Sequence, residues 1–352
     1  MSIVRALFHR WEHRLATRDD FERRVLPFEW GAAHLPPFGD WRVPSDDSSE
    51  AEIVALHVDR ALEQSDAYFE LPPIEDYRLE GDVLSFTSAA PTGVVENDLV
   101  RATYFPVSGN GDRADGPAVV VLPQWNSRVG AQAGLCRLLN HFDLTALKVA
   151  LPYHEGRMPP DSRRADYTLS PNIGRTLQSV RQAVLDARAC VTWLAEAGYG
   201  PIGIIGTSLG SCIAFITFAH EPLLETAVFN HISPYFADVV WHGISTRQVR
   251  EGLEKGIQLD PLRRLWLPLS PYAYYERLRA TQRRCLLIYG KYDLSFPPDL
   301  SLALLEDFRR LEIDHEVFAL PCGHYTTAKF PFNWMDGLSI SRFVSKELKK
   351  SS

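Results

Sequence analysis

An α/β fold with a mostly parallel sheet is the class that the sequence predicts. From about residue 76 onward, short apolar runs alternate with amphipathic segments, as strands and helices do around a parallel sheet. The run 118–122 is β-branched and apolar throughout, which is typical of a strand that is buried on both faces. We therefore expect one sheet to organise most of the 352 residues.

Eight segments have the composition and length of strands. They span 82–89, 99–107, 118–122, 144–151, 202–205, 227–232, 285–289 and 316–320. The Gly/Asp-rich stretch 108–116 is expected to be a loop between the second and third strands. A long helix is expected over 176–197, where apolar residues recur at helical spacing until Gly198.

Two regions fall outside this alternation. Residues 1–75 are helix-rich and hold three of the eight tryptophans, so they are expected to form a helical N-terminal extension. The main domain then spans 76–352. Within it, an insertion at about 233–281 is aromatic-rich and helical in pattern, and it separates two core strands. Such an insertion is expected to fold over one end of the sheet as a cap or lid.

Composition excludes several classes of protein. The formal net charge of −7 argues against nucleic acid as a main partner. No stretch approaches the roughly 20 consecutive apolar residues that cross a membrane, and residues 1–5 lack the apolar core of a secretion signal. Five scattered cysteines without a CxxC pair are typical of free thiols in a reducing compartment. These features predict a cytoplasmic protein.

The motif Gly206-Thr207-Ser208-Leu209-Gly210 lies between the apolar runs 202–205 and 213–216. A buried strand that turns abruptly into a helix, with Ser at the apex, predicts a nucleophile elbow. The flanking glycines are needed because any side chain there would collide with the reversed chain. The alternative is a glycine-rich turn with no catalytic role.

A serine nucleophile needs a histidine as base and a carboxylate that orients the histidine. His324 directly follows the last predicted strand, and Asp293 follows the strand before it. The alternatives are a turn histidine at position 324 and Asp299 as the acid, although Asp299 suits a helix N-terminus. The order Ser208, Asp293, His324 is the order associated with a nucleophile elbow.

Attack on a carbonyl also requires two backbone N–H groups that stabilise an oxyanion. Leu209, directly after the serine, is expected to supply one of them. The second is expected from the loop after the strand 118–122, with Trp125 as first choice and Gln124 as second.

With these residues placed, the chain resembles the alpha/beta-hydrolase superfamily over roughly residues 80–348. The resemblance rests on the GTSLG turn at 206–210, the KYD turn ending at Asp293 and the CGH turn ending at His324. It implies an eight-stranded, mostly parallel sheet flanked by helices, and esterase, lipase or peptidase chemistry without a cofactor or metal. Many members have His-Gly where this chain has Pro123-Gln124. A distant similarity to the abhydrolase-domain-containing protein 18 group rests on overall layout.

Other side chains are candidates for substrate contact. Tyr153 and Arg157 follow the fourth strand, and Trp241 lies in the insertion. Further arginines in the loop after that strand, and at the start of the following helix, are either anion-binding or solvated: Arg163, Arg164 and Arg175. His154 is expected to form hydrogen bonds within its loop rather than bind a metal.

The first helix is expected to be amphipathic. Ile3, Val4, Leu7, Phe8, Trp11 and Leu15 share one face. Packing of this face against the core or a second subunit is favoured over contact with a membrane surface.

The sequence thus predicts a serine hydrolase that cleaves a carboxylic ester, with a small-molecule ester or lipid as substrate. A peptidase, an amidase or an acyltransferase would use the same triad. The contrasting class is a non-catalytic binding protein of the same fold. A homodimer and a peripheral membrane contact stay open.

Overall fold

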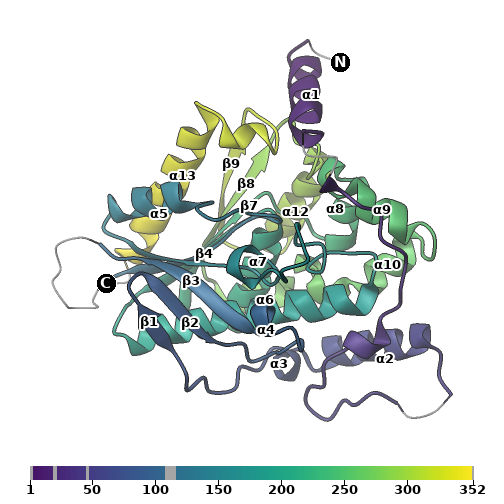
Figure 1. The fold of residues 1–352 in the computed structure, drawn as a ribbon. Helices are drawn as coiled ribbons and strands as arrows, with labels where there is room; N and C mark the ends of the chain where they lie inside the picture. Colours follow the sequence, from purple (N-terminus) through teal and green to yellow (C-terminus); the bar gives the residue numbers. More distant parts are fainter. Residues whose placement is uncertain (1–2, 19–21, 45–46, 108–115, 351–352) are drawn as a thin grey trace.

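The computed structural model describes residues 3–18, 22–44, 47–107 and 116–350, and it is organised around one sheet (Figure 1). Within these residues the sheet has nine strands in the order β1-β2-β3-β5-β4-β6-β7-β8-β9. The strands are β1 (Arg78–Glu80), β2 (Val83–Thr87), β3 (Leu99–Phe105), β4 (Ala118–Leu122), β5 (Thr145–Val149), β6 (Ile202–Thr207), β7 (Leu224–Asn230), β8 (Cys285–Gly290) and β9 (His315–Leu320). Strands β1 to β3 are antiparallel, and β3 pairs antiparallel with β5. The pairs from β5 and β4 through β9 are parallel.

The sheet differs from the expected eight strands by one. The additional strand β1 has three residues, all exposed, and it pairs only with β2 at the edge of the sheet. An exposed edge strand of this length has no apolar pattern that a sequence could reveal. Most of the predicted loop 108–116, residues 108–115, lies outside the described residues.

Helices cover both faces of the sheet. They are α1 (Ile3–Ala16), α2 (Glu50–Glu63), α3 (Ser65–Tyr68), α4 (Val95–Asp98), α5 (Ala133–Asn140), α6 (Ile173–Glu196), α7 (Leu209–His220), α8 (Phe236–His242), α9 (Arg247–Leu253), α10 (Leu259–Leu265), α11 (Tyr275–Thr281), α12 (Pro298–Arg310) and α13 (Phe332–Leu348). Single 3₁₀ turns are η2 (Ala32–His34), η3 (Glu155–Arg157), η4 (Ile244–Thr246), η5 (Leu267–Leu269), η6 (Pro271–Tyr274) and η7 (Thr326–Ala328). One core cluster joins the sheet to α6, α7 and α12, and a second joins it to α5 and α13.

Helix α6 begins three residues before the predicted start. The side chain of Asn172 accepts a hydrogen bond from the backbone N–H of Arg175 at 2.8 Å, so Asn172 is the N-cap. The predicted end is confirmed, since α6 stops at Glu196 and Gly198 has a φ of 96°. This long helix packs against α7 and supports the strands from which the candidate site projects.

The N-terminal segment contributes two unlike helices. Helix α2 begins at a capping box between Ser49 and Glu52, and it buries Val54 and Val58. Helix α1 stands at the edge of the molecule (Figure 1). Most of its apolar face does not pack against the core of this chain, and packing of that face against a second subunit stays a prediction. Ile3, Val4, Leu7 and Trp11 are exposed, whereas Phe8 and Leu15 are partly buried.

None of the described helices is long and apolar enough to cross a membrane.

Between β7 and β8 the chain forms α8, α9, α10 and α11 with short 3₁₀ turns. Aromatic contacts hold this segment together, such as the stacked pair Tyr235 and Tyr272, whose ring centroids are 4.8 Å apart. Trp266 is fully buried against Phe236. The helical pattern expected for 233–281 is therefore present.

Candidate active site

Ser208 stands at the apex of an abrupt turn between β6 and α7. Its backbone φ of 57° and ψ of −118° lie in a region that residues other than glycine rarely adopt. The turn is closed so tightly that a Cβ on Gly206 would lie 2.1 Å from the carbonyl oxygen of Gly210. A Cβ on Gly210 would lie 2.4 Å from the carbonyl oxygen of Leu122. Both glycines are therefore required by close backbone approach.

The turn opens into a cavity of about 1560 Å³. Ser208, Leu209 and His324 line it together with Gln124 and Trp125 from the loop after β4. The N-terminal segment also reaches this cavity through Leu15, Ala16 and Arg23. Segment 233–281 reaches it through Ser233, Tyr235, Phe236, Val239 and Val240, among others. Several stretches that are distant in sequence thus line one cavity.

Asp293 and His324 lie beyond the carboxyl ends of β8 and β9, and they contact each other. Nδ1 of His324 is 3.1 Å from Oδ2 of Asp293. The other carboxylate oxygen, Oδ1, accepts hydrogen bonds from the backbone N–H groups of Ser295 and Phe296 at 2.7 and 2.8 Å. The Asp293 side chain is therefore fixed at both oxygens. The competing acid, Asp299, lies in the first turn of α12.

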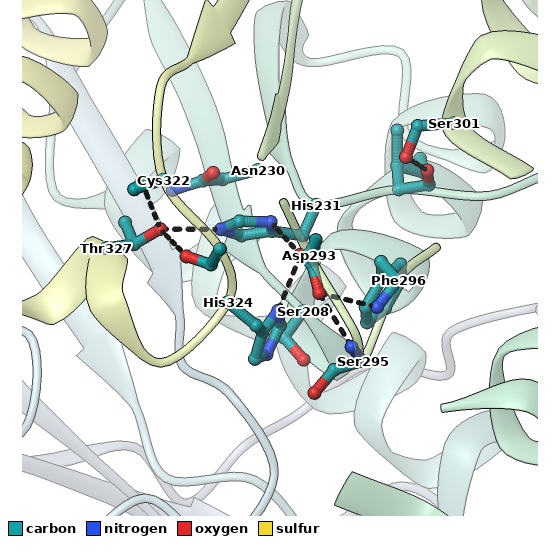
Figure 2. A network of polar contacts seen from close by, with 12 residues as sticks. Ser208, Asn230, His231, Asp293, Ser295, Phe296, Ser301, Cys322, His324 and Thr327 are labelled. Atoms are coloured by element: carbon teal, nitrogen blue, oxygen red, sulfur yellow. Dashed lines mark hydrogen bonds and ion pairs between the residues drawn. The ribbon is translucent and has the colours of Figure 1, made fainter. Parts of the chain in front are cut away.

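Figure 2 draws the Ser208 side chain next to the His324 ring, on the opposite side from Asp293. The two side chains form no hydrogen bond with each other within the described residues. Contacts between nucleophile and base are often long without substrate and shorten when it binds. Phe296 stacks on the His324 ring at a centroid distance of 5.5 Å and limits its rotation.

His231, which was not among the site residues predicted from the sequence, is a second histidine that contacts the same carboxylate. Its Nδ1 lies 2.8 Å from Oδ2 of Asp293, and its ring centroid is 4.6 Å from that of His324 (Figure 2). Its Nε2 is 3.4 Å from the hydroxyl of Thr327. His231 directly follows β7 and is 2% exposed. A polar residue directly after a buried strand is the signal that could have found it, as it found Asp293 and His324.

Burial and charge together set the protonation of this cluster. Burial opposes ionisation of Asp293, but the charge and hydrogen bonds of His324 and His231 outweigh it and hold the pKa of Asp293 well below its usual value. Burial acts to lower the pKa of His324, and the Asp293 carboxylate and the charge of Glu12 reverse this, so the pKa of His324 is raised above 6.5. Burial lowers the pKa of His231, which favours a neutral ring.

His231, Asp293 and His324 are also a group with metal-ligand spacing, since their donor atoms lie within 4.8 Å of one another. Two imidazole nitrogens already lie at 2.8 and 3.1 Å from the same carboxylate oxygen. A zinc ion needs ligand atoms at about 2.0–2.2 Å. This arrangement fits a hydrogen-bonded cluster better than a metal centre.

The expected oxyanion donors lie at the same cavity. Within the described residues, the backbone N–H groups of Leu209 and Trp125 have no hydrogen-bond partner. The Trp125 ring is held from behind, because its Nε1 donates to the carbonyl of Ala165 at 2.9 Å and the Arg164 guanidinium lies 5.5 Å from the ring centroid. The side chain of Gln124 accepts a hydrogen bond from Gln132 at 3.2 Å.

The predicted substrate contacts at Tyr153, Arg157 and Trp241 need correction, because none of these residues lines the cavity. Arg157 is fully buried and forms an ion pair with Asp186 at 2.8 Å, so Asp186 and not a substrate balances its charge. Tyr153 packs against Tyr167, and Trp241 is 8% exposed beneath Arg250.

Of the other candidate arginines, Arg163 and Arg164 line the cavity, whereas Arg175 lies over the Tyr167 ring. The hydrogen-bonding role expected of His154 is confirmed. Its Nε2 accepts from the backbone N–H of Asn126 at 2.8 Å, and its Nδ1 lies 2.8 Å from the carbonyl of Pro152.

No protein-family model matches the sequence, and no curated protein matches it. Several solved structures are similar to this chain. The chain is similar to an acetyl xylan esterase from a Thermoanaerobacterium species, with 15% identity and a TM-score of 0.57 over 87% of this chain and 95% of that one. An acetyl xylan esterase from a Paenibacillus species gives 13% identity and a TM-score of 0.57 over 90% and 98%.

A third similar structure is an acylaminoacyl peptidase from Pyrococcus horikoshii, with 13% identity and a TM-score of 0.54. The match covers 78% of this chain and 49% of the peptidase, so the chain spans about half the length of that protein. At these identities the likeness establishes the fold. The chain has the alpha/beta-hydrolase fold, as its sequence predicted.

Proposed function

We propose that the protein is a serine hydrolase that cleaves a carboxylic ester through an acyl-enzyme. The main support is the presence of a strained serine and a histidine–carboxylate pair at one cavity. Ser208 occupies a strained strand–helix apex, and the cavity that it lines also contains His324, which is paired with Asp293. A polar cavity alone would not require the backbone strain at Ser208 or the two glycines that permit it.

In the proposed reaction, His324 Nε2 removes the hydroxyl proton of Ser208 while Oγ attacks the ester carbonyl carbon. The tetrahedral intermediate collapses as His324 returns this proton to the leaving alkoxide, which departs as an alcohol. Water, activated by His324, then attacks the acyl-serine and releases a carboxylic acid. Asp293 keeps Nδ1 of His324 protonated and stabilises the imidazolium that forms in each step.

The oxyanion of the intermediate would be bound by the backbone N–H groups of Leu209 and Trp125. Their lack of partners in the described structure supports this role, because unpaired donors at a cavity wall are available to a ligand. Gln124 is the second choice to Trp125. Removal of one donor of this kind typically slows acyl transfer by about 10²–10³-fold.

The cavity favours a substrate with an apolar or aromatic part. Tyr235, Phe236 and Pro271 line it from segment 233–281. We infer that this segment acts as a cap over the substrate. Arg163 and Arg164 also line this cavity, and Arg164 is paired with Asp166 at 3.4 Å.

Labelling with a fluorophosphonate tests the serine chemistry directly. The reagent forms a covalent adduct with an activated serine, so the native protein should gain one adduct on the peptide that contains Ser208. Ser208→Ala should gain none. Ser339→Ala, which changes a hydroxyl on α13 that donates to the carbonyl of Asp336, is a matched control that should label like the native protein. An unlabelled native protein would leave the non-catalytic binding protein as the better reading.

Ester and amide substrates separate the remaining alternatives. p-Nitrophenyl esters of increasing chain length should be turned over, and aminoacyl anilides should not. Turnover of anilides alone would make the protein a peptidase or amidase. Faster product formation with an added alcohol than with water would make it an acyltransferase.

A further inference from the structure

Helix α1 packs against the turns that contain both Asp293 and His324. The Phe8 ring stacks on Tyr292, the residue before Asp293, with centroids 4.6 Å apart and an interplanar angle of 13°. The two turns also bond to each other, because the backbone N–H of Tyr292 donates to the carbonyl of Cys322 at 3.0 Å. A helix from the start of the chain thus touches both turns of the candidate site.

Glu12 makes the closer of these contacts. Its side chain is fully buried, and its two oxygens accept hydrogen bonds from the residues directly after His324. Oε2 accepts from the backbone N–H of Tyr325 at 3.0 Å, and Oε1 accepts from that of Thr326 at 2.8 Å. On the other side of His324, a Cβ on Gly323 would lie 2.5 Å from Cδ of Glu12. The carboxylate therefore packs against the backbone on both sides of the histidine.

This carboxylate has no ion-pair partner among the described residues. A buried carboxylate without hydrogen bonds would be strongly unfavourable, so the two backbone donors and Glu12 depend on each other. Arg23 also connects α1 to the turn after His324. Its Nη2 donates to the carbonyl of Ala16 at the end of α1 and lies 3.4 Å from the Tyr325 hydroxyl.

We propose that Glu12 is a positioning residue for His324, and that α1 is a working part of the active site. The inference rests on the proposed function, in which His324 is the base. Glu12 touches neither Ser208 nor the substrate in this proposal. It holds residues 323–326 so that Nδ1 of His324 meets Asp293 and Nε2 points to Ser208.

The charge of Glu12 gives a readout that simple loosening of the loop would not. The charged or titratable groups that face His324 are Asp293 beyond β8, His231 beyond β7, Glu12 on α1 and the neighbouring Tyr325, whose ring centroid is 5.9 Å away. Burial lowers the pKa of His324, and both carboxylates raise it. Removal of the Glu12 charge should therefore lower the pKa of His324 and move the acid limb of the rate profile to lower pH.

The experiment compares the native protein with Glu12→Gln and Glu12→Asp, and uses Glu306→Gln, at an exposed position on α12, as the matched control. The readouts are kcat and KM for a p-nitrophenyl ester from pH 5 to 9. For Glu12→Gln we expect kcat to fall by about 10- to 100-fold with little change in KM, since small misplacement of a catalytic group has effects of this size. Its acid limb should shift to lower pH.

Glu12→Asp keeps the charge but shortens the side chain, so kcat should fall while the acid limb stays in place. This variant also serves if Glu12→Gln fails to fold, as judged by circular dichroism. Native kcat and an unmoved limb in folded Glu12→Gln would overturn the inference. A native protein that neither labels with fluorophosphonate nor turns over esters would instead overturn the proposed function.

Discussion

Oδ2 of Asp293 lies closer to Nδ1 of His231, at 2.8 Å, than to Nδ1 of His324, at 3.1 Å. One carboxylate oxygen therefore serves two imidazoles, while the other oxygen is occupied by two backbone N–H groups. Burial lowers the pKa of His231, which favours the neutral ring, and Nδ1 of that ring can act as an N–H donor to the carboxylate. His231 contacts the same oxygen of Asp293 as His324 does, with the two ring centroids 4.6 Å apart.

Replacement of His231 by Phe should remove this donor and keep most of the ring volume. A hydrogen bond to a charged group is worth about 1.5–3 kcal/mol, and 1.4 kcal/mol in a barrier is tenfold in rate. We therefore expect kcat/KM for a p-nitrophenyl ester to fall by about 10- to 100-fold. His242→Phe, at an exposed position on α8, is the control. Native kcat/KM in His231→Phe would mean that His231 only fills space.

The pH dependence of kcat/KM should report the raised pKa of His324. The ring can accept the Ser208 proton only when it is neutral, so activity should fall as the pH decreases through this pKa. Although burial opposes the shift, the charges of Asp293 and Glu12 place the midpoint above 6.5. The measurement is kcat/KM for p-nitrophenyl acetate between pH 5 and 9. A midpoint at or below 6.5 would contradict the charge arrangement described for the cluster.

The positions of Ser208, Asp293 and His324 could be predicted from a local pattern, since Ser208 directly follows β6 and the other two lie three and four residues beyond β8 and β9. Parallel strands bring such residues to one edge of the sheet, whatever the sequence separation. The strands were also predictable from local patterns, because each core strand is a short apolar run. The exception is β1, whose three residues are all exposed.

Glu12 was not predictable from such patterns. Its partners are 313 and 314 residues away, and a glutamate among arginines on an amphipathic helix has the pattern of a solvated face. Arg157 was misjudged for a related reason. A charged residue in a loop suggests solvent or substrate, and its partner Asp186 lies within the apolar pattern of α6.

Replacement of Arg157 by Met should destabilise the fold and leave substrate binding unchanged. Arg157 and Asp186 are 0% and 1% exposed, and the guanidinium also donates to the carbonyls of Asn97 and Ala150. Loss of one partner of a buried ion pair typically costs about 3–5 kcal/mol. Urea unfolding should show a decrease of this size in the free energy of unfolding, with KM for the ester unchanged.

The double variant Arg157→Met with Asp186→Leu is the control for this prediction. Apolar replacement of a whole buried pair is often neutral, so the double variant should recover much of the lost stability. A raised KM with native stability in Arg157→Met would instead restore the substrate contact that the sequence suggested.

Asp336 on α13 should make the stability of the protein depend on pH. Burial raises the pKa of its carboxyl to about 7, and Oδ2 accepts a hydrogen bond from Asn230 at 2.9 Å. Oδ1 of Asp336 and Oδ1 of Asn230 are both buried without a hydrogen-bond partner among the described residues. A protonated carboxyl would carry a hydrogen-bond donor, which the ionised carboxylate lacks.

Because the folded pKa exceeds the ordinary value of 3.8, the folded state binds more protons than the unfolded state between these two values. The contribution of Asp336 is therefore fully present below pH 3.8 and is lost as the pH rises to about 7, with a slope of at most about 1.4 kcal/mol per pH unit. Asp336→Asn carries a permanent amide donor and should lack this loss. In urea unfolding, the free energy of unfolding of the variant relative to that of the native protein should be higher at pH 8 than at pH 5. An equal difference at both pH values would mean that Asp336 is ionised throughout this range in the folded protein.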